Sequence, residues 1–203
     1  MVVWNAGNRS RNRRFARVTQ SFDPGLIVCL TGPESTGKST LSKELATALG
    51  VPLVEEVARE ILECREASAQ RAVSTQDLLE IAKAQVAAEQ AALAEGGGLV
   101  VCDTDLLVIK VWWQEKFGEP HPWLQEELAA RTPRRYLLMV PDLPWEPDPL
   151  RDAPNDRHRL FDSYLSALRS DRFPFAEVFG EGSERFERAM ACIQDWLSEP
   201  EYS

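Results

Sequence analysis

The sequence predicts an α/β fold in which a five-stranded parallel sheet is flanked by helices. Short apolar runs that suit buried strands alternate with longer segments of helical periodicity, a pattern typical of parallel sheets with crossover helices. The expected strands are 26–30, 52–54, 99–102, 136–140 and 174–179. The expected helices are 41–49, 57–65, 74–95, 106–117, 121–130, 156–169 and 183–197, and Ser74, with Asp77 three residues on, is the expected N-cap of the third. Ligands of such a sheet bind at the carboxyl ends of its strands.

The first expected strand leads directly into a phosphate-binding loop. Residues 32–40 fit the pattern G-x-x-x-x-G-K-[ST] at every constrained position, between an apolar strand and an amphipathic helix, where a chance glycine-rich turn is rare. In such a loop, backbone N–H groups and the helix N-terminus bind phosphate oxygens. We expect Lys38 to reach the β- and γ-phosphates and Ser39 to offer its hydroxyl to Mg²⁺. The predicted nucleotide-binding residues are Gly32, Pro33, Glu34, Ser35, Thr36, Gly37, Lys38, Ser39 and Thr40.

Length and composition indicate one globular domain. The 203 residues and the hydrophobic content of 44% fit a single α/β core. The formal net charge of −9 argues against a nucleic-acid-binding surface. The sequence contains no run of 18 apolar residues, so it predicts no membrane-spanning helix. Four widely spaced cysteines suit a reducing compartment. We therefore expect a cytoplasmic protein without nucleic-acid or membrane partners, and the sequence leaves open whether it forms a homo-oligomer.

Two segments depart from the regular alternation of strands and helices. Residues 1–22 form an arginine-rich arm that we expect to be a flexible, solvated tail, with the single domain covering 23–203. Residues 141–158 have no apolar periodicity and are rich in proline and aspartate. A long irregular loop that carries arginines suits a lid over a nucleotide, although a plain polar loop is the alternative. Arg151 and Arg159 are the candidate lid arginines, and Trp145 is a candidate ligand contact.

Acidic residues follow the second and third expected strands. Glu55 and Glu56 come after the second strand, and Asp103 and Asp105 come after the third. Because the carboxyl ends of parallel strands meet at one edge of a sheet, we expect these side chains to face one crevice. Asp103 is expected to bind Mg²⁺ or to act as a general base, and Asp105 either is catalytic or caps the next helix. Arg59 either binds a substrate oxygen or forms a surface ion pair.

These features favour a small-molecule kinase over other phosphate-loop proteins. No N-K-x-D stretch specifies guanine, and 203 residues leave little room for the extra helical domain of an AAA-type motor. A short core with an arginine-bearing lid suits a nucleoside-kinase-like enzyme that uses ATP and Mg²⁺ and accepts a small nucleoside. The alternative is a regulatory ATP-binding protein that acts through a protein partner, which the acidic, proline-rich loop would recruit.

The order of the motifs resembles the ribosylnicotinamide kinase domain of bacterial NadR proteins, within the NadR-type ATPase and kinase family. The matching motifs are G-P-E-S-T-G-K-S-T over 32–40, E-V-A-R-E over 56–60, D-T-D over 103–105, P-W at 144–145, and Leu150-Arg151 with Arg159 eight residues later. The resemblance covers about residues 25–197. The phosphate loop occurs in many families, but its combination with E-x-A-R-E and D-T-D is much more specific.

The resemblance implies transfer of the ATP γ-phosphate to the 5′-hydroxyl of nicotinamide riboside, a step of NAD metabolism. It implies that Glu56 and Arg59 lie on the substrate side, that Asp103 is the base or a metal ligand, and that Arg151 and Arg159 act from the lid. Glu55, which could favour a cationic ring, and Trp145 of the loop are further candidate substrate contacts. Family members often carry an aromatic residue beside the position of Glu56 and another late in the long helix. Here the neighbours are Glu55 and Val57, and the second position falls near Gln90, in a stretch without rings.

Overall fold

The computed structural model describes residues 25–59, 61–62, 73–95, 98–130, 133–147 and 155–199. The arm predicted over residues 1–22 and the predicted lid residue Arg151 lie outside these ranges. Of the helix expected over 57–65, the described residues 57–59 and 61–62 are helical.

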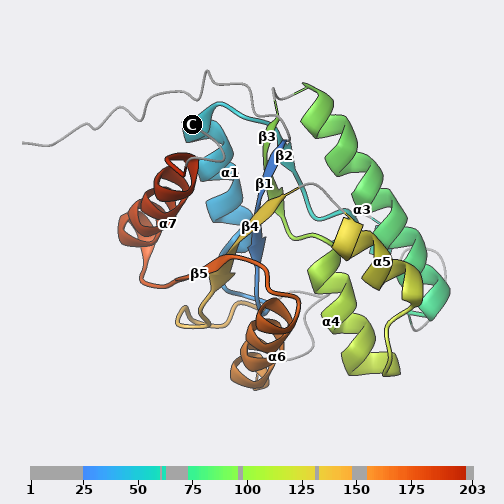
Figure 1. The fold of residues 1–203 in the computed structure, drawn as a ribbon. Helices are drawn as coiled ribbons and strands as arrows, with labels where there is room; N and C mark the ends of the chain where they lie inside the picture. Colours follow the sequence, from blue (N-terminus) through green and yellow to red (C-terminus); the bar gives the residue numbers. More distant parts are fainter. Residues whose placement is uncertain are drawn as a thin grey trace, which may run out of the picture.

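A parallel sheet of five strands forms the centre of the described structure, which confirms the predicted fold class (Figure 1). The strands are β1 (Leu26–Thr31), β2 (Leu53–Val54), β3 (Leu99–Asp103), β4 (Arg134–Met139) and β5 (Phe175–Val178). Their order is β2-β3-β1-β4-β5, so β1 pairs with β3 on one side and with β4 on the other. The phosphate loop that follows β1 therefore begins near the middle of the sheet.

The helices lie close to the ranges that the sequence predicts. They are α1 (Lys38–Leu49), α3 (Thr75–Glu95), α4 (Leu106–Phe117), α5 (Pro122–Ala130), α6 (Arg157–Ser170) and α7 (Gly182–Leu197). Helix α1 begins earlier than its apolar pattern indicated, because the polar residues Lys38 to Thr40 form its first turn. At the start of α3, Ser74 and Asp77 exchange reciprocal hydrogen bonds of 2.8 and 3.2 Å between side chain and backbone, as the sequence predicts for an N-terminal cap.

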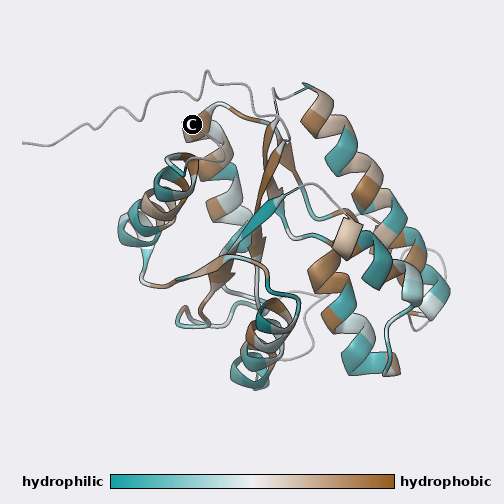
Figure 2. Cartoon of the chain, viewed as in Figure 1, coloured by the Kyte–Doolittle hydropathy of each residue, from teal (hydrophilic) through white to brown (hydrophobic). Residues whose placement is uncertain are grey.

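Two apolar cores cover the two faces of the sheet. Leu26, Val28 and Leu30 of β1 belong to the core that α1 and α7 cover. Ile27 and Cys29 belong to the opposite core, which includes residues of α4 and α6. This alternation follows from the twofold side-chain period of a strand, and it explains why the strands read as continuous apolar runs. Figure 2 shows apolar colour along most of the strands, hydrophilic colour at the start of β4, and polar colour on much of the outer helical surface.

Strand β4 begins with two buried arginines that sequence periodicity did not place in a strand. Arg134 and Arg135 precede the apolar run predicted over 136–140, and both side chains are largely buried. Arg134 forms ion pairs with Glu89 and Asp105, and Arg135 forms one with Glu199 at 2.7 Å. Buried charges are tolerated where partners replace the lost water, so the strand can start two residues early.

Candidate functional site

The phosphate loop fits its place in the fold because two glycines have conformations that a side chain would disturb. Gly32 has φ +128°, and a Cβ atom added there would lie 2.9 Å from the carbonyl oxygen of Met139 in β4. Gly37 has φ +78° and precedes α1, so the loop turns into the helix through a left-handed residue. The loop therefore lies against β4 while the N-terminus of α1 opens toward its concave side.

Cationic side chains hold the carbonyl groups of this loop. Lys38 Nζ donates to the carbonyl oxygens of Gly32 and Pro33 at 3.0 and 2.6 Å. Arg157 Nη1 donates to Ser35 O at 3.3 Å, and Arg185 Nη1 donates to Thr36 O at 2.8 Å. A carbonyl and the following N–H point in opposite directions across a trans peptide. The carbonyls that Arg157 and Arg185 hold from α6 and α7 therefore direct the next N–H groups away from these two helices.

Asp103 ends β3 beside the start of α1. It accepts a hydrogen bond from Ser39, and its Oδ1 atom is buried and has no hydrogen-bond partner among the described residues. Burial raises the pKa of Asp103 by disfavouring the charged form, although Ser39, Lys38 and Lys43 lower it. The hydroxyl of Ser39 and a carboxylate with spare bonding capacity are oxygen donors that suit Mg²⁺. These two residues fit the magnesium site that the sequence predicts.

The two glutamates after β2 point into different surroundings. Glu55 is exposed and pairs with Lys43 of α1 at 3.0 Å on the surface. Glu56 is partly buried near Lys38, Asp103, Arg59 and Glu34, all of which shift its pKa. Burial is the main reason that the pKa of Glu56 is raised from its ordinary value of 4.5, and nearby Asp103 raises it further while Lys38 lowers it. Both glutamates lie near Asp103, since Glu55 also raises the pKa of Asp103, but Glu56 is the less exposed of the two.

Asp105 lies in a buried network behind the phosphate loop. Its carboxylate accepts hydrogen bonds from the backbone N–H of Leu107 at 2.9 Å, from Tyr136 Oη at 2.7 Å and from Arg134. It is the N-cap of α4, which is one of the two roles that the sequence allows for it. Burial lowers the pKa of Arg134, but Asp105 and the other acidic groups around it raise the pKa by more than burial lowers it. The pKa is therefore raised overall, and this guanidinium stays charged.

The segment that begins the predicted lid lies on the phosphate loop. Ser35 Oγ donates to Pro144 O at 3.4 Å and accepts from the backbone N–H of Glu146 at 2.8 Å. Arg157 donates to Leu143 O at 2.8 Å, and its guanidinium lies 5.8 Å from the ring centre of Trp145. Trp145, predicted on the substrate side, is therefore beside the phosphate loop.

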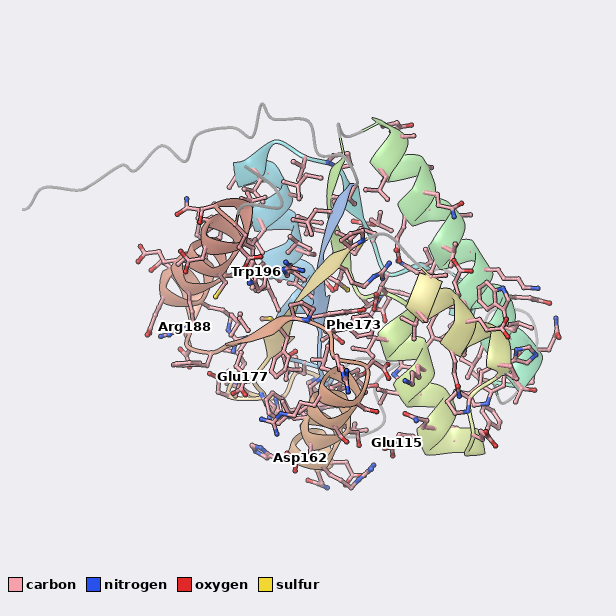
Figure 3. The ribbon with its side chains drawn as sticks, in the orientation of Figure 1. Glu115, Asp162, Phe173, Glu177, Arg188 and Trp196 are labelled. Carbon is pink, nitrogen blue, oxygen red and sulfur yellow. The ribbon has the colours of Figure 1, made fainter. Side chains whose placement is uncertain are left out.

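Among the described residues at the end of the predicted lid, the arginine that contacts the phosphate loop is Arg157 and not Arg159. Arg159 donates to Glu115 at 2.6 Å and to Asp156 at 3.3 Å, and its side chain is 55% exposed. Glu115 and Asp162 project from the neighbouring helices α4 and α6, and together with Arg159 they line a polar hollow between these helices (Figure 3). Arg151 lies outside the described residues. The sequence did not identify Arg157 as the lid arginine because its only signal is its position at the start of the helix after the loop.

Aromatic residues reach the acidic cluster from helices other than those expected. Gln90 lies near the position where the family often has an aromatic residue late in the long helix, and it is exposed on α3. Tyr164 of α6 is buried, hydrogen-bonded by Trp112 of α4, and close enough to Glu56 for that carboxylate to raise its pKa, although burial is the larger cause. Trp113, by contrast, is packed in the apolar core between α3, α4 and α5. The tryptophan pair thus divides between core and the surroundings of the site.

The described residues also limit which metal sites and membrane spans this part of the chain could form. Within the described residues, no group of three or more histidine, cysteine, aspartate or glutamate side chains could hold a metal ion by itself. Magnesium at Ser39 and Asp103 would therefore need oxygens from the nucleotide or from water, as is usual for this ion. In the same part of the chain, no helix is both long and apolar enough to cross a membrane.

Comparisons with known proteins agree with this architecture. A family model described as an AAA domain, AAA_28, matches residues 27–185. No curated protein sequence matches the chain. A crystal structure of NadR protein in complex with NR is similar with a TM-score of 0.72 and 20% identity, over 85% of this chain and 52% of that one. Another, of NadR protein with NAD and AMP-PNP, has a TM-score of 0.66, again at 20% identity, and covers 85% and 50% of the two chains.

Shorter proteins match over nearly their whole length. Thymidylate kinase from Ehrlichia chaffeensis has a TM-score of 0.59 and 14% identity, with 86% of this chain and 100% of that chain covered. Deoxyadenosine kinase from M. mycoides, with products bound, has a TM-score of 0.58 and 15% identity, with 83% and 99% covered. The chain spans about half the length of the NadR chains. The predicted resemblance to NadR is confirmed at the level of the fold.

Proposed function

The chain belongs to the AAA_28 family of AAA domains and has the fold of phosphate-loop nucleoside and nucleotide kinases, and from this premise we propose that it is an ATP- and Mg²⁺-dependent small-molecule kinase. The observation that carries the proposal is a pair of carboxylates beside Lys38 of the phosphate loop, the buried Asp103 and the partly buried Glu56. Asp103 accepts a hydrogen bond from the Ser39 hydroxyl, and it lies close enough to Glu56 to raise the pKa of that carboxyl group.

The phosphate loop binds the donor in this proposal. Its inward N–H groups and the N-terminus of α1 accommodate the phosphate oxygens. Lys38, which contacts Gly32 O and Pro33 O in this structure, moves its ammonium group to the β- and γ-phosphates. Ser39 and Asp103 hold Mg²⁺, which when bound offsets the charge that develops between the β- and γ-phosphates.

Glu56 is the proposed general base for the acceptor. The oxygen of the acceptor hydroxyl forms a bond to the γ-phosphorus, the bond from that phosphorus to the β,γ-bridging oxygen breaks, and ADP leaves. The hydroxyl proton passes to Glu56, whose raised pKa makes it a stronger proton acceptor than an exposed glutamate. Asp103 remains the alternative base, and Asp105 a third candidate that would first have to leave its partners at Leu107, Arg134 and Tyr136.

The segment over 141–158 acts as the proposed lid. Arg157 already contacts the phosphate loop through Ser35 O, so a small rearrangement of its guanidinium would bring it to a phosphate oxygen. Trp145, against Arg157, would cover the donor side and exclude water, which limits ATP hydrolysis. Arg151 and Arg159 stay candidates for the same task on the strength of the family resemblance.

Nicotinamide riboside is the first candidate acceptor. The resemblance to NadR in sequence motifs and in fold supports it. The acidic surroundings of Glu34, Glu56 and Asp103 suit a ligand with a cationic ring. Arg59 lies near Glu56, which supports its proposed contact with a substrate oxygen, whereas Glu55 would have to leave Lys43 to make one.

A nucleoside panel tests the proposal. Purified protein is incubated with ATP, Mg²⁺ and one nucleoside at a time, including nicotinamide riboside, and mass spectrometry detects the nucleoside monophosphate. We expect one nucleoside to gain a phosphate and Lys38→Ala to form no product while remaining folded. If ATP binds but no nucleoside is phosphorylated, the kinase proposal is wrong, and ATPase activity that rises with a co-purified protein would favour the regulatory alternative.

A further inference from the structure

Arg185 of α7 joins three parts of the molecule that are far apart in sequence. Its side chain is only 5% exposed. Its guanidinium donates to Thr36 O in the phosphate loop at 2.8 Å, to Gly180 O after β5 at 2.7 Å and to Val140 O after β4 at 3.3 Å. It also pairs with the carboxylate of Asp142. Neither the nucleotide-binding pattern nor the lid pattern of the sequence includes this residue.

The contact with Thr36 fixes the orientation of one peptide group in the phosphate loop. The carbonyl of Thr36 and the N–H of Gly37 belong to the same trans peptide, so they point in opposite directions. Thr36 is buried, its hydroxyl donates to Pro33 O at 2.9 Å, and the neighbouring Gly37 is left-handed at φ +78°. Because Arg185 holds the carbonyl from the α7 side, the Gly37 N–H is directed into the loop before any phosphate arrives.

The same guanidinium also holds the base of the proposed lid. Val140 and Asp142 lie where the chain leaves β4 for the segment that contacts Ser35. Asp142 in turn accepts a hydrogen bond of 2.7 Å from the backbone N–H of Gly180. A planar guanidinium with several fixed donors can join such a set of acceptors, whereas an ammonium group cannot hold them all in one geometry.

Arg188 shows that these contacts are not a general property of arginines on α7. It lies three residues further along, pairs with Glu184 at 3.1 Å and stacks on the exposed ring of Phe179 at 3.6 Å (Figure 3). None of its described contacts reaches the phosphate loop. The inward set of acceptors is therefore specific to Arg185.

We propose that Arg185 is a positioning residue that pre-orients the Gly37 N–H for phosphate and ties the phosphate loop to the base of the lid. It touches no reacting atom. It acts by removing the cost of ordering the loop when nucleotide binds, since preorganised donors need no rearrangement at that moment. This inference rests on the proposed nucleotide site but not on the identity of the acceptor.

The test compares the affinities for ADP and for adenosine. If Arg185 acts through the phosphate loop, Arg185→Met should weaken ADP binding about 10- to 100-fold, the range expected for loss of a charge-assisted hydrogen bond, and leave adenosine binding within about twofold. Arg185→Lys should fall between Arg185→Met and the wild type, because it keeps the charge but not the fork of donors. Calorimetry would measure ADP, and ligand-observed NMR would measure adenosine.

Arg135→Met is the matched control. Arg135 is also a largely buried arginine paired with a carboxylate, but it lies at the start of β4, at the opposite end of the strands from the phosphate loop. We expect this variant to lose stability and keep the affinity for ADP. Equal ADP affinity in Arg185→Met and wild type, or equal losses for ADP and adenosine, would overturn the inference.

Two further outcomes are decisive. Should Arg185→Met not fold, Arg185→Lys carries the test, and undiminished ADP affinity in that variant would count against the inference. Wild-type protein that binds no ADP would instead contradict the proposed function, so the two failures are distinguishable.

Discussion

Asp103 and Asp105 lie two residues apart in sequence, and each is the centre of a polar cluster. The two aspartates differ in how completely their carboxylate oxygens are paired. Around Asp103, the described contacts leave a buried carboxylate oxygen without a hydrogen-bond partner. Around Asp105, the carboxylate accepts from a backbone N–H, a tyrosine hydroxyl and an arginine, all from the chain itself. Spare bonding capacity in a buried group costs stability, so of the two aspartates Asp103 is the one whose pairing a ligand would complete. The Asp105 network also has buried atoms without a hydrogen-bond partner among the described residues, but they are the Nε and Nη2 atoms of Arg134 and not carboxylate oxygens.

The Asp105 cluster shows what a structural use of the same residue type looks like. Gln85 donates to Glu89 at 3.2 Å and to Thr104 O at 3.3 Å, and Glu89 pairs with Arg134. Thr104, between the two aspartates, has φ +73°, a conformation that is unfavourable for a β-branched residue. The network thus holds the turn whose preceding residue is Asp103. In the proposed mechanism, the Asp103 cluster takes part in the chemistry and the Asp105 cluster fixes its position.

The largest expected effect comes from Asp103. Asp103→Asn should lower kcat about 10³-fold or more because it removes the charge that complements the phosphate-bound metal, while the affinity for ADP without metal stays within about threefold. Its Tm should change by less than about 3 °C, since Ser39 is its one described hydrogen-bond partner. Product formation and thermal unfolding would measure both. A variant with near-wild-type kcat would remove Asp103 from the catalytic set.

Glu56 should give the next largest effect and a pH signature. Glu56→Gln should lower kcat about 10²- to 10⁴-fold, the usual contribution of a general base. In the wild type, the base must be deprotonated, so kcat/KM falls as the pH drops through its pKa. Because burial raises that pKa, the midpoint of the fall should lie above pH 4.5, the ordinary value.

The pH profile distinguishes a base from a positioning residue. In Glu56→Gln, the residual activity should lack this acidic limb. The same limb persisting in Glu56→Gln would assign the base to another group, with Asp103 as the next candidate.

Asp105→Asn should reverse the pattern expected for Asp103. It leaves Arg134 as a buried charge with one carboxylate fewer, and breaking such a pair costs about 3–5 kcal/mol of the free energy of unfolding. The kcat of the folded fraction should stay within about tenfold of wild type, because Asp105 contributes no atom to the proposed reaction. Urea unfolding and activity per folded molecule would show this. Loss of activity without loss of stability would contradict the structural role.

The smallest expected difference separates two arginines of α6. Arg157→Met should lower kcat/KM for ATP about tenfold, because it removes a donor that lies against Ser35 and Trp145. Arg159→Met should change it by less than about threefold, since this exposed side chain bonds Glu115 and Asp156. Steady-state kinetics with varied ATP would compare them. The opposite order would restore Arg159 as the lid arginine that the family resemblance implies.

The parts of the site that the sequence predicts are those with local signals. The phosphate loop and the Ser74 cap are read from short patterns whose geometry is fixed by neighbouring residues. Whether Glu55 or Glu56 turns inward, and whether Asp103 or Asp105 keeps a spare oxygen, depends on contacts with α1, α3 and β4 that no local pattern carries. The sequence does not reveal the role of Arg185 for the same reason, because its partners Asp142 and Thr36 lie 43 and 149 residues away in sequence.

The role of magnesium tests the central contrast most directly. Calorimetric titration of ADP with and without Mg²⁺, into wild type and Asp103→Asn, isolates the contribution of the Asp103 cluster from any turnover. We predict that Mg²⁺ strengthens ADP binding to the wild type at least about tenfold and to Asp103→Asn less than about twofold. An equal strengthening in both proteins would contradict the assignment of Asp103 and Ser39 to the metal and leave the two aspartate clusters without the proposed division of roles.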